Sequence, residues 1–179
     1  MTNGTSGHFA DFFHDDQDMV EAAAEFLHEG FMAGQSCIAV FTHDHWAQIK
    51  AQLRMRGWNA QELIDEYRFV VLGAHETLAS MWIDDRLDVR QFYQRFGELI
   101  RLMAAGGKEV RIVGELVGLL ANFGRFDAVI QLEEMANDLT REHTFRMYCM
   151  YCDSSFTKQL DVRARRRVCA VHSGSLRVS

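Results

Sequence analysis

The chain has 179 residues, of which 48% are hydrophobic and 25% are charged, as is ordinary for a single folded globular domain. Its formal net charge of -6 argues against a general affinity for nucleic acid, because the phosphate backbone favours a basic surface. The apolar stretches fall short of the roughly 20 residues that a bilayer span requires, and the start lacks a signal-peptide pattern, so we expect a cytoplasmic protein without membrane contact.

Residues 1–179 are expected to form one domain, with residues 1–7 flexible. There is no proline, so no Pro-rich linker divides the chain. The four cysteines are few for this length, and most lie in apolar, strand-like runs. We therefore expect reduced thiols and no secreted disulfide framework.

The first half of the chain alternates between helical and strand patterns. Residues 15–35 begin with Asp residues suited to an N-cap, carry apolar residues at helical spacing and reach a stop at Gly34, which predicts an amphipathic helix. Residues 36–41 are a continuous apolar run, typical of a strand covered on both faces. Two helices over 45–57 and 59–67 and a second buried strand over 68–74 are predicted next.

The second half continues the alternation. Helices are predicted over 76–87, 89–107 and 126–143, and Asp88 is the predicted cap of the second. Strands are predicted over 109–116 and 145–151. Residues 167–174 are expected to form a fifth strand or an edge element. Strands that alternate with helices indicate an α/β fold, a three-layer α/β/α domain around a mostly parallel sheet.

Ligands in such folds bind at the carboxyl ends of the strands. Polar residues follow the apolar runs at these points, and they can converge on one crevice: Thr42, His43, His75, Glu115 and Asp153. A carboxylate at the end of a buried strand, as at Glu115, is partly desolvated, although it also suits a helix N-terminus.

Motifs for common enzyme chemistry are missing. The loop after the first predicted strand, "VFTHDHWAQ", has neither glycine nor lysine, and the chain has no G-x-x-x-x-G-K-[ST], G-x-G-x-x-G or G-x-S-x-G pattern. We expect no catalytic residues and no enzyme activity, with no cofactor. A noncanonical nucleotide-binding enzyme at the same crevice stays open as an alternative.

A zinc or thiol redox switch at Cys149, Cys152, Cys169 and His172 is a second alternative, because these residues form a C-x-x-C and a C-x-x-H pair. Strand geometry counts against it: Cys149 and Tyr151 point to one face, and Cys152 to the other. The H-x-H pair at His43 and His45 lacks a third ligand nearby. The expected metal site is therefore none, with Cys149 and Cys169 as small core residues.

Arginines cluster near the end of the chain, in "VRARRRV". They can meet a phosphate or an acidic partner, but a solvated helix face explains them as well. With the acidic overall balance, nucleic acid is not an expected partner.

Several segments together resemble one family. "HFADFF", "FMAGQSCIAVFT", "VRIVGELVGLL", "LEEMANDL", "CMY" and "CAVHS" resemble the MEDS family, the sensory domain of methanogen and methylotroph regulators, over about residues 8–176. The family looks like a degenerate relative of the KaiC and RecA ATPases that has lost the phosphate loop. The resemblance implies a RecA/KaiC-like domain without a Walker A loop.

The resemblance also implies site residues. The positions that match the family are His8, Phe13, Gly114, Glu115, Leu132, Glu133, Asn137, Cys149, Tyr151 and His172. The expected ligand-binding residues are His8, Phe13, Thr42, His43, Glu115, Glu133, Asn137, Cys149, Tyr151 and His172. Phe13 stands where the family often has tyrosine, and Cys152 lies outside the pattern. Glu133 and Asn137 share one helical face, and His8 and His172 are expected to join Glu115 at the carboxyl edge of the sheet.

The implied function is sensory and non-catalytic: a domain that binds a small ligand or a partner protein in bacterial or archaeal regulation. The chain has no extra segment long enough for a kinase or DNA-binding domain, so it is expected to act by association. The expected partners are an unknown small molecule, a regulatory protein such as a histidine kinase or transcription factor, and further copies of the chain.

Overall fold

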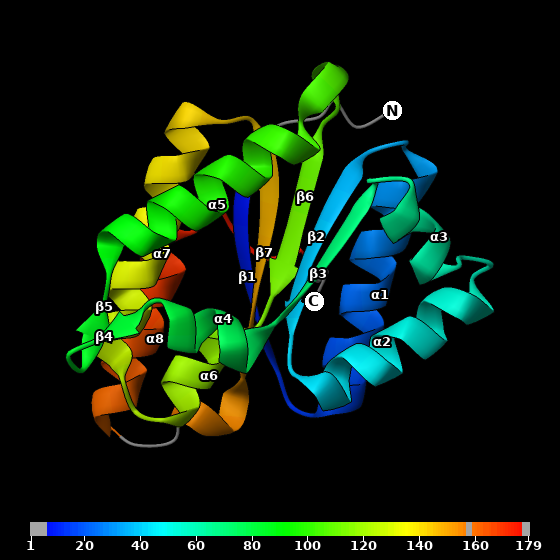
Figure 1. The fold of residues 1–179 in the computed structure, drawn as a ribbon. Helices are drawn as coiled ribbons and strands as arrows, with labels where there is room; N and C mark the ends of the chain where they lie inside the picture. Colours follow the sequence, from blue (N-terminus) through cyan, green and yellow to red (C-terminus); the bar gives the residue numbers. More distant parts are fainter. Residues whose placement is uncertain (1–6, 157–158, 177–179) are drawn as a thin grey trace.

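A parallel sheet of five strands forms the middle layer of the protein, in the order β1-β7-β6-β2-β3 (Figure 1). The computed structural model describes residues 7–156 and 159–176, without the side chains of 159–161. The strands of the sheet are β1 (Gly7–Phe13), β2 (Ser36–Phe41), β3 (Phe69–Gly73), β6 (Val110–Gly114) and β7 (Phe145–Cys152). A separate antiparallel hairpin consists of β4 (Trp82–Ile83) and β5 (Arg86–Leu87).

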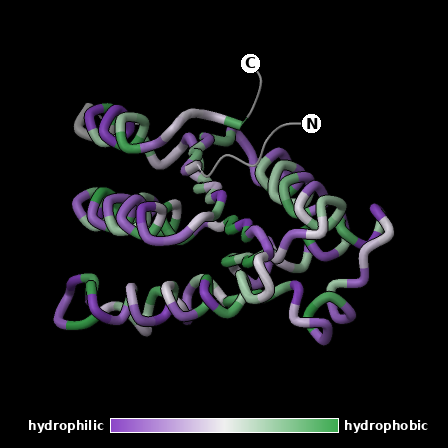
Figure 2. Tube along the Cα trace, turned by 90° about the horizontal axis from the view of Figure 1, so that it is seen from above, coloured by the Kyte–Doolittle hydropathy of each residue, from purple (hydrophilic) through white to green (hydrophobic). Residues whose placement is uncertain are grey.

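Helices cover both faces of the sheet, which gives the three-layer α/β/α arrangement seen from above in Figure 2. One face carries α1 (Asp16–Met32), α2 (His43–Met55) and α3 (Ala60–Asp65). The other carries α4 (Ala74–Ser80), α5 (Val89–Met103), α6 (Leu116–Asn122), α7 (Phe126–Glu142) and α8 (Gln159–Val171). Short 3-10 turns span Ala105–Gly107 and Asp153–Phe156. The predicted fold class is confirmed.

Local sequence signals set several helix starts as predicted. Asp15 accepts a hydrogen bond from the Asp18 N–H at the start of α1, and Asn59 accepts one from Gln61 at the start of α3. Asp88 accepts from two N–H groups at the start of α5. Each cap satisfies backbone donors that the first helical turn leaves unpaired.

Side chains alternate between the two faces along each strand, and this divides the core into two clusters. In β7, Cys149 and Tyr151 pack among α5–α8, whereas Tyr148 and Met150 pack against α1 on the opposite face. The predicted orientation of Cys149 and Tyr151 toward one face is therefore confirmed.

The prediction of a helix over 76–87 is wrong beyond Ser80. Residues after Met81 turn into the β4–β5 hairpin, whose turn residues Asp84 and Asp85 have left-handed φ values of 49° and 62°. Two consecutive left-handed residues cannot continue a right-handed helix, and Asp tolerates this conformation better than most residues.

Two further elements, β1 and α6, were not predicted. β1 was missed because His8 and Asp11 interrupt its apolar pattern; both are buried polar residues. The strand predicted over 109–116 ends at Gly114. The helix α6 begins soon afterwards, at Leu116, and was not predicted.

The expected strand or edge element over 167–174 is mostly helix, since α8 extends to Val171. Only Gly174 bridges to β1, opposite Phe9, and the Ser173 N–H donates to the His8 carbonyl at 2.6 Å. The segment after α8 thus lies along the free edge of β1. Of the residues expected to be flexible, 1–6 lie outside the described part of the chain, and Gly7 begins β1.

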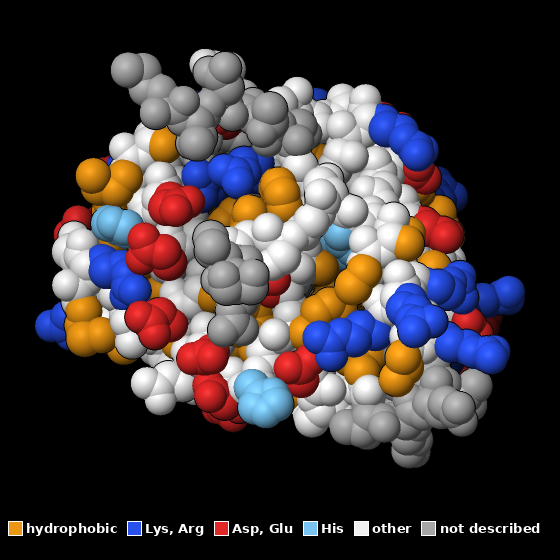
Figure 3. Space-filling view, turned by 180° about the vertical axis from the view of Figure 1, so that it is seen from behind, with side chains coloured by type: hydrophobic (Ala, Val, Ile, Leu, Met, Phe, Trp, Pro, Cys, Tyr) orange, Lys and Arg blue, Asp and Glu red, His pale blue; other side chains and the backbone are white. Residues whose placement is uncertain are grey.

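The arginine run lies on α8, on the side of the molecule where Figure 3 shows Lys and Arg side chains gathered. Arg163, Arg166 and Arg167 are exposed, as expected of a solvated helix face. Arg165 differs: it pairs with Asp153 at 2.6 Å and lies over the Phe12 ring at 4.0 Å. Among the described residues, no helix is both long and apolar enough to cross a bilayer.

Gly118 allows α6 to approach β7 closely, because a Cβ at this position would lie 2.7 Å from the Met150 carbonyl oxygen. We expect Gly118→Ala to lower the free energy of unfolding by about 1–3 kcal/mol, since the backbone must shift. Gly97 in α5 is the matched control: its Cβ would meet nothing nearer than 4.0 Å, so Gly97→Ala should stabilise by about 0.5–1 kcal/mol. Chemical denaturation measures both, and equal effects at the two positions would contradict the close approach.

Candidate functional site

Glu133 carries a carboxylate that is fully buried, with 0% exposure, on the inner face of α7. Its neighbours on that face are apolar, including Val129, Ile130 and Ala136. A buried carboxylate is costly unless other groups satisfy it. The contacts of Glu133 therefore define the candidate site.

Groups from three other segments surround this carboxylate. From β1, His8 Nε2 lies 3.0 Å from Glu133 Oε2, and after α8, His172 Nε2 lies 3.2 Å from Oε1. From β7, the Cys149 thiol donates to Oε2 at 3.4 Å, and the Tyr151 hydroxyl donates to Oε1. His8 Nε2 also lies 3.2 Å from Cys149 Sγ.

Asn137, one turn along α7, completes the arrangement. Its Oδ1 lies 3.0 Å from His8 Nδ1, and its Nδ2 donates to the Val171 carbonyl at 2.7 Å. We refer to these residues as the Glu133 cluster: His8, Glu133, Asn137, Cys149, Tyr151 and His172. The cluster joins β1, α7, β7 and the segment after α8.

The groups of the cluster shift one another's pKa values. Burial alone would raise the pKa of Glu133, but the interactions with His172 and His8 outweigh it and hold that pKa below its usual value. Desolvation lowers the pKa of His172, yet the Glu133 carboxylate raises it by more. For Cys149, burial and then the charge of Glu133 raise the thiol pKa, so the thiol stays protonated at neutral pH.

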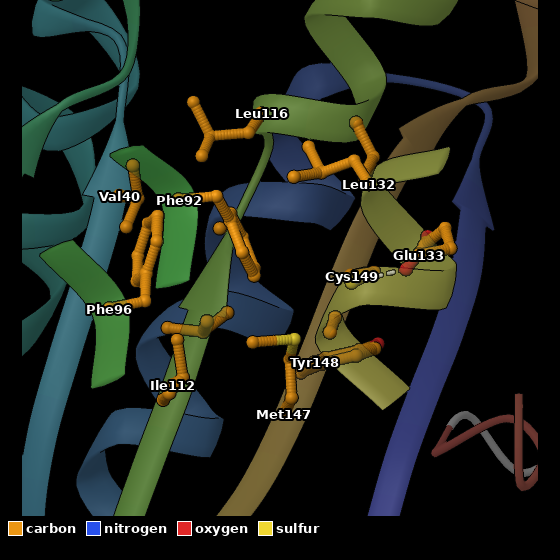
Figure 4. A pocket seen from close by; sticks show the side chains of 14 residues that line it. Val40, Phe92, Phe96, Ile112, Leu116, Leu132, Glu133, Met147, Tyr148 and Cys149 are labelled. Atoms are coloured by element: carbon orange, nitrogen blue, oxygen red, sulfur yellow. Dashed lines mark hydrogen bonds between the residues drawn. The ribbon is translucent and has the colours of Figure 1, made fainter. Parts of the chain in front are cut away.

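A cavity of about 50 Å³ adjoins the cluster between α5, α7 and the strands β6 and β7 (Figure 4). Its lining is apolar apart from Glu133 and Cys149 at one end. Figure 4 shows Phe92 and Phe96 of α5 across from Leu132, with Ile112 and Met147 on the strands. Tyr148 borders the cavity too, but its hydroxyl donates to Asp11 at 2.7 Å on the opposite face. The surface that faces the cavity is thus apolar, and the Glu133 carboxylate, at 0% exposure, lies behind it at one end.

Glu115 forms a second, smaller polar group at the carboxyl ends of β2 and β6. Its carboxylate accepts from the Thr42 N–H at 2.6 Å and contacts His45 Nδ1 at 2.8 Å. Thr42 is the N-cap of α2, so the Glu115 charge lies at the positive end of that helix. This is the place where phosphate-binding proteins of similar architecture hold their phosphates.

Both members of this pair are shifted in pKa. The hydrogen bond to Glu115 raises the pKa of His45 above its ordinary 6.5, against the smaller lowering by burial. Burial raises the pKa of Glu115, but His45 and the Thr42 N–H together lower it more. At mildly acidic pH both side chains are therefore charged: His45 is protonated and Glu115 is ionised.

The structure separates the predicted site residues into groups. It brings His8, Glu133, Asn137, Cys149, Tyr151 and His172 together in the Glu133 cluster. Thr42 and Glu115 meet at the other site. The expectation that His8 and His172 join Glu115 is wrong, because both histidines lie under α7 on the sheet face and contact Glu133 instead.

Two predicted site residues lie elsewhere. Phe13 is buried on the α1 face, where its ring centroid lies 6.5 Å from that of Tyr148. His43 is 85% exposed and lies 3.6 Å from Glu76. The prediction of a single crevice at the strand ends also fails for His75 and Asp153. His75 lines a separate pocket of about 420 Å³ with Trp82, and Asp153 pairs with Arg165.

The cysteine and histidine set of the zinc or redox alternative is not assembled either. Cys149 and His172 share the Glu133 cluster, but Cys152 contacts Ser154 at 2.9 Å and Cys169 is exposed on α8. All four cysteines are free thiols.

Sequence reasoning missed His45 and the aromatic lining of the cavity. His45 was noted only as half of an H-x-H pair, and no local signal shows that the first turn of α2 aims it at Glu115. Phe92 and Phe96 lie within the helix predicted over 89–107, but a helix prediction does not distinguish a cavity wall from a filled core.

Removing the charge of Glu133 should weaken the fold severely. We expect Glu133→Gln to lower the free energy of unfolding by about 3 kcal/mol or more, because the histidines lose their buried counter-charge. The neighbouring Glu134 is exposed, so Glu134→Gln should change stability by less than about 0.5 kcal/mol. Urea denaturation compares the two, and a Glu133→Gln variant as stable as Glu134→Gln would show that the cluster does not hold the fold.

The Glu115–His45 pair predicts a pH dependence. Because the folded-state pKa of His45 is raised, its contribution is fully present below pH about 6.5 and is lost as pH rises through the folded value. The lowered pKa of Glu115 gives a contribution present above pH about 4.5 that is lost as pH falls through its folded value. His45→Gln should therefore cost about 1–3 kcal/mol near pH 6 and less at higher pH.

Free energies of unfolding measured between pH 5 and 9 test this difference. His43→Gln is the matched control, since the exposed His43 side chain should contribute little. A wild-type advantage over His45→Gln that stays constant across this range would refute the assignment.

The chain was compared with known proteins. A family model described as MEDS, the MEthanogen/methylotroph, DcmR Sensory domain, matches residues 7–173. No curated protein matches the chain. The matched range includes every member of the Glu133 cluster, from His8 to His172. The chain therefore belongs to the MEDS family of sensory domains.

Proposed function

We propose that this sensory domain detects a small, mostly apolar molecule bound in the cavity beside the Glu133 cluster. The observation that carries the proposal is the composition of the cavity wall. Apolar and aromatic side chains form the surface of the wall, and the Glu133 carboxylate lies directly behind it at one end. Binding sites commonly combine an apolar body with a few polar groups that fix orientation.

The size of the cavity limits the ligand. A volume of about 50 Å³ exceeds the roughly 10–15 Å³ that a cavity needs to hold one water molecule, and it is below the roughly 150 Å³ that accommodates benzene. The ligand we propose has a few non-hydrogen atoms.

Binding there can be transmitted through α5. Phe92 and Phe96 line the cavity from this helix, and α5 packs against α7, which carries Glu133. A ligand between the two helices contacts both, so it can favour one spacing between them over another. We propose that this change in helix spacing alters binding to a partner. The partner is a regulatory protein, such as a histidine kinase or a transcription factor, or a second copy of the chain.

We further propose that the domain works without catalysis and does not bind nucleotide phosphates as its ATPase-like relatives would. The Glu115 carboxylate already accepts the hydrogen bond of the Thr42 N–H at the start of α2. Its negative charge would repel a phosphate at the same place. We also propose that the domain is related to the KaiC and RecA ATPases.

Cavity filling tests the ligand site. Ala136 lines the cavity and is 3% exposed, so Ala136→Val should fill part of it. We expect wild-type protein to bind xenon and short alcohols such as ethanol, seen as shifts of the Met147 methyl signal in NMR spectra. Ala136→Val should weaken this binding at least about tenfold, which corresponds to about 1.4 kcal/mol.

The matched control is Ala47→Val on the exposed side of α2, which makes the same change in helix propensity away from the cavity. It should leave binding unchanged. No response of Met147 to either probe in wild-type protein, or an equal loss of binding in both variants, would exclude the cavity as the ligand site.

A further inference from the structure

The Glu133 cluster contains four groups of the types that bind transition metals. They are the imidazoles of His8 and His172, the thiol of Cys149 and the carboxylate of Glu133. One ligand atom from each of them lies within 4.8 Å of all the others. The four residues come from β1, α7, β7 and the segment after α8, so tertiary folding assembles the set.

Both imidazoles are oriented as metal ligands usually are. His8 Nδ1 faces Asn137 Oδ1 at 3.0 Å, and His172 Nδ1 faces the Val168 carbonyl at 2.6 Å. Because Asn137 Nδ2 donates to Val171, its Oδ1 is the acceptor toward His8. Each Nδ1 therefore donates, and in the neutral imidazole Nε2 directs its lone pair toward the other members of the cluster. Metal-binding histidines typically have this second hydrogen bond.

When both imidazoles are neutral, as metal ligands are, acceptors face one another unless a proton or a cation lies between them. His172 Nε2 is buried, with a side-chain exposure of 1%, and has no hydrogen bond of acceptable geometry, although Glu133 Oε1 is 3.2 Å away. His8 Nε2 faces both Glu133 Oε2 and Cys149 Sγ. A buried polar atom without a partner is uncommon and calls for an explanation. One cation between these atoms would satisfy all of them.

We propose that His8, Glu133, Cys149 and His172 bind one divalent metal ion of the zinc type. Two imidazoles, one thiolate and one carboxylate form a tetrahedral ligand set of the kind zinc prefers, and the nitrogen and sulfur atoms disfavour magnesium and calcium. The thiolate and the carboxylate together carry two negative charges, which a divalent cation neutralises. The resulting site is neutral, as a buried site beside an apolar cavity requires.

Two of the distances already match a tetrahedral ion, whereas the ligand atoms of the whole set lie within 4.8 Å of one another and must draw closer together around it. Zinc bonds of about 2.0–2.3 Å in a tetrahedron place neighbouring ligand atoms about 3.3–3.7 Å apart. The distance between Cys149 Sγ and Glu133 Oε2 is 3.4 Å, and His8 Nε2 lies 3.2 Å from Cys149 Sγ. The Tyr151 hydroxyl bonds to Glu133 Oε1 and would hold the carboxylate in place while Oε2 binds the ion.

The site goes beyond the proposed ligand cavity and does not depend on it. With all four protein ligands in place, the ion has a closed coordination shell, as in structural zinc sites. It would connect the first strand to the last segment of the fold. Because Glu133 and Cys149 also border the cavity, the ion would form the polar end of the cavity.

Metal analysis of the untagged full-length protein tests this inference, with no organic ligand present. We expect one zinc per chain by elemental mass spectrometry after purification without chelator. After chelation, cobalt(II) should restore binding and give the visible bands of a tetrahedral ion with a thiolate-to-cobalt charge-transfer band. Cys149→Ser should remove the charge-transfer band and weaken metal binding about a hundredfold or more, since loss of a supporting residue already costs 10–100-fold.

Controls are available within the same chain. Cys152→Ser, three residues along β7, and His14→Gln, whose side chain is 91% exposed, should bind the metal as wild type does. His172→Gln should behave as Cys149→Ser does. If these variants fail to fold, X-ray absorption of zinc-loaded wild-type protein decides: one sulfur and three nitrogen or oxygen neighbours are expected.

Absence of stoichiometric metal binding by wild-type protein would overturn the inference. A zinc coordination shell without sulfur, or an unchanged cobalt spectrum in folded Cys149→Ser, would also overturn it. None of these outcomes affects the xenon and ethanol measurements, so failure of the metal site and failure of the ligand cavity can be told apart.

Discussion

The burial of the Glu133 carboxylate is the constraint on which the rest of the structure depends. An ionised group at 0% exposure is tolerated only when charged and hydrogen-bonding partners surround it. Those partners come from His8 near the start of the described chain, from Cys149 and Tyr151 in β7 and from His172 near its end. The need to satisfy one side chain therefore explains why both ends of the domain meet beneath α7, beside the edge strand β1.

The candidate binding site also lies away from the position that is usual in this class of fold. Open α/β sheets bind ligands at the carboxyl ends of their strands. Here the protein fills that position itself, because Glu115 occupies the start of α2 and pairs with His45. The cavity lies instead on the face of the sheet, under α5 and α7, beside the Glu133 cluster. Our proposal of a sensory role without phosphate chemistry rests on this division between a closed sheet edge and a cavity in the core.

Periodic elements could be predicted from the sequence, and exceptions to periodicity could not. The helix predicted over 15–35 forms between its Asp15 cap and Gly34, and β2 matches its predicted range, because caps and continuous apolar runs are local signals. β1 was missed since His8 and Asp11 are buried polar residues whose partners lie far away in the chain. The hairpin after α4 was missed because it depends on left-handed φ values at Asp84 and Asp85.

The sequence by itself determined the α/β class, the main elements and the family, and it indicated six residues as separate candidate positions: His8, Glu133, Asn137, Cys149, Tyr151 and His172. Only the tertiary structure decided that these residues form one cluster. Two neighbours of Glu133, His8 and Cys149, lie 125 positions before it and 16 after it, so no spacing rule connects them. The same holds for Glu115, which meets His45 across 70 positions. Local patterns arise from contacts between near neighbours, whereas a site built across strands and helices exists only once the sheet has formed.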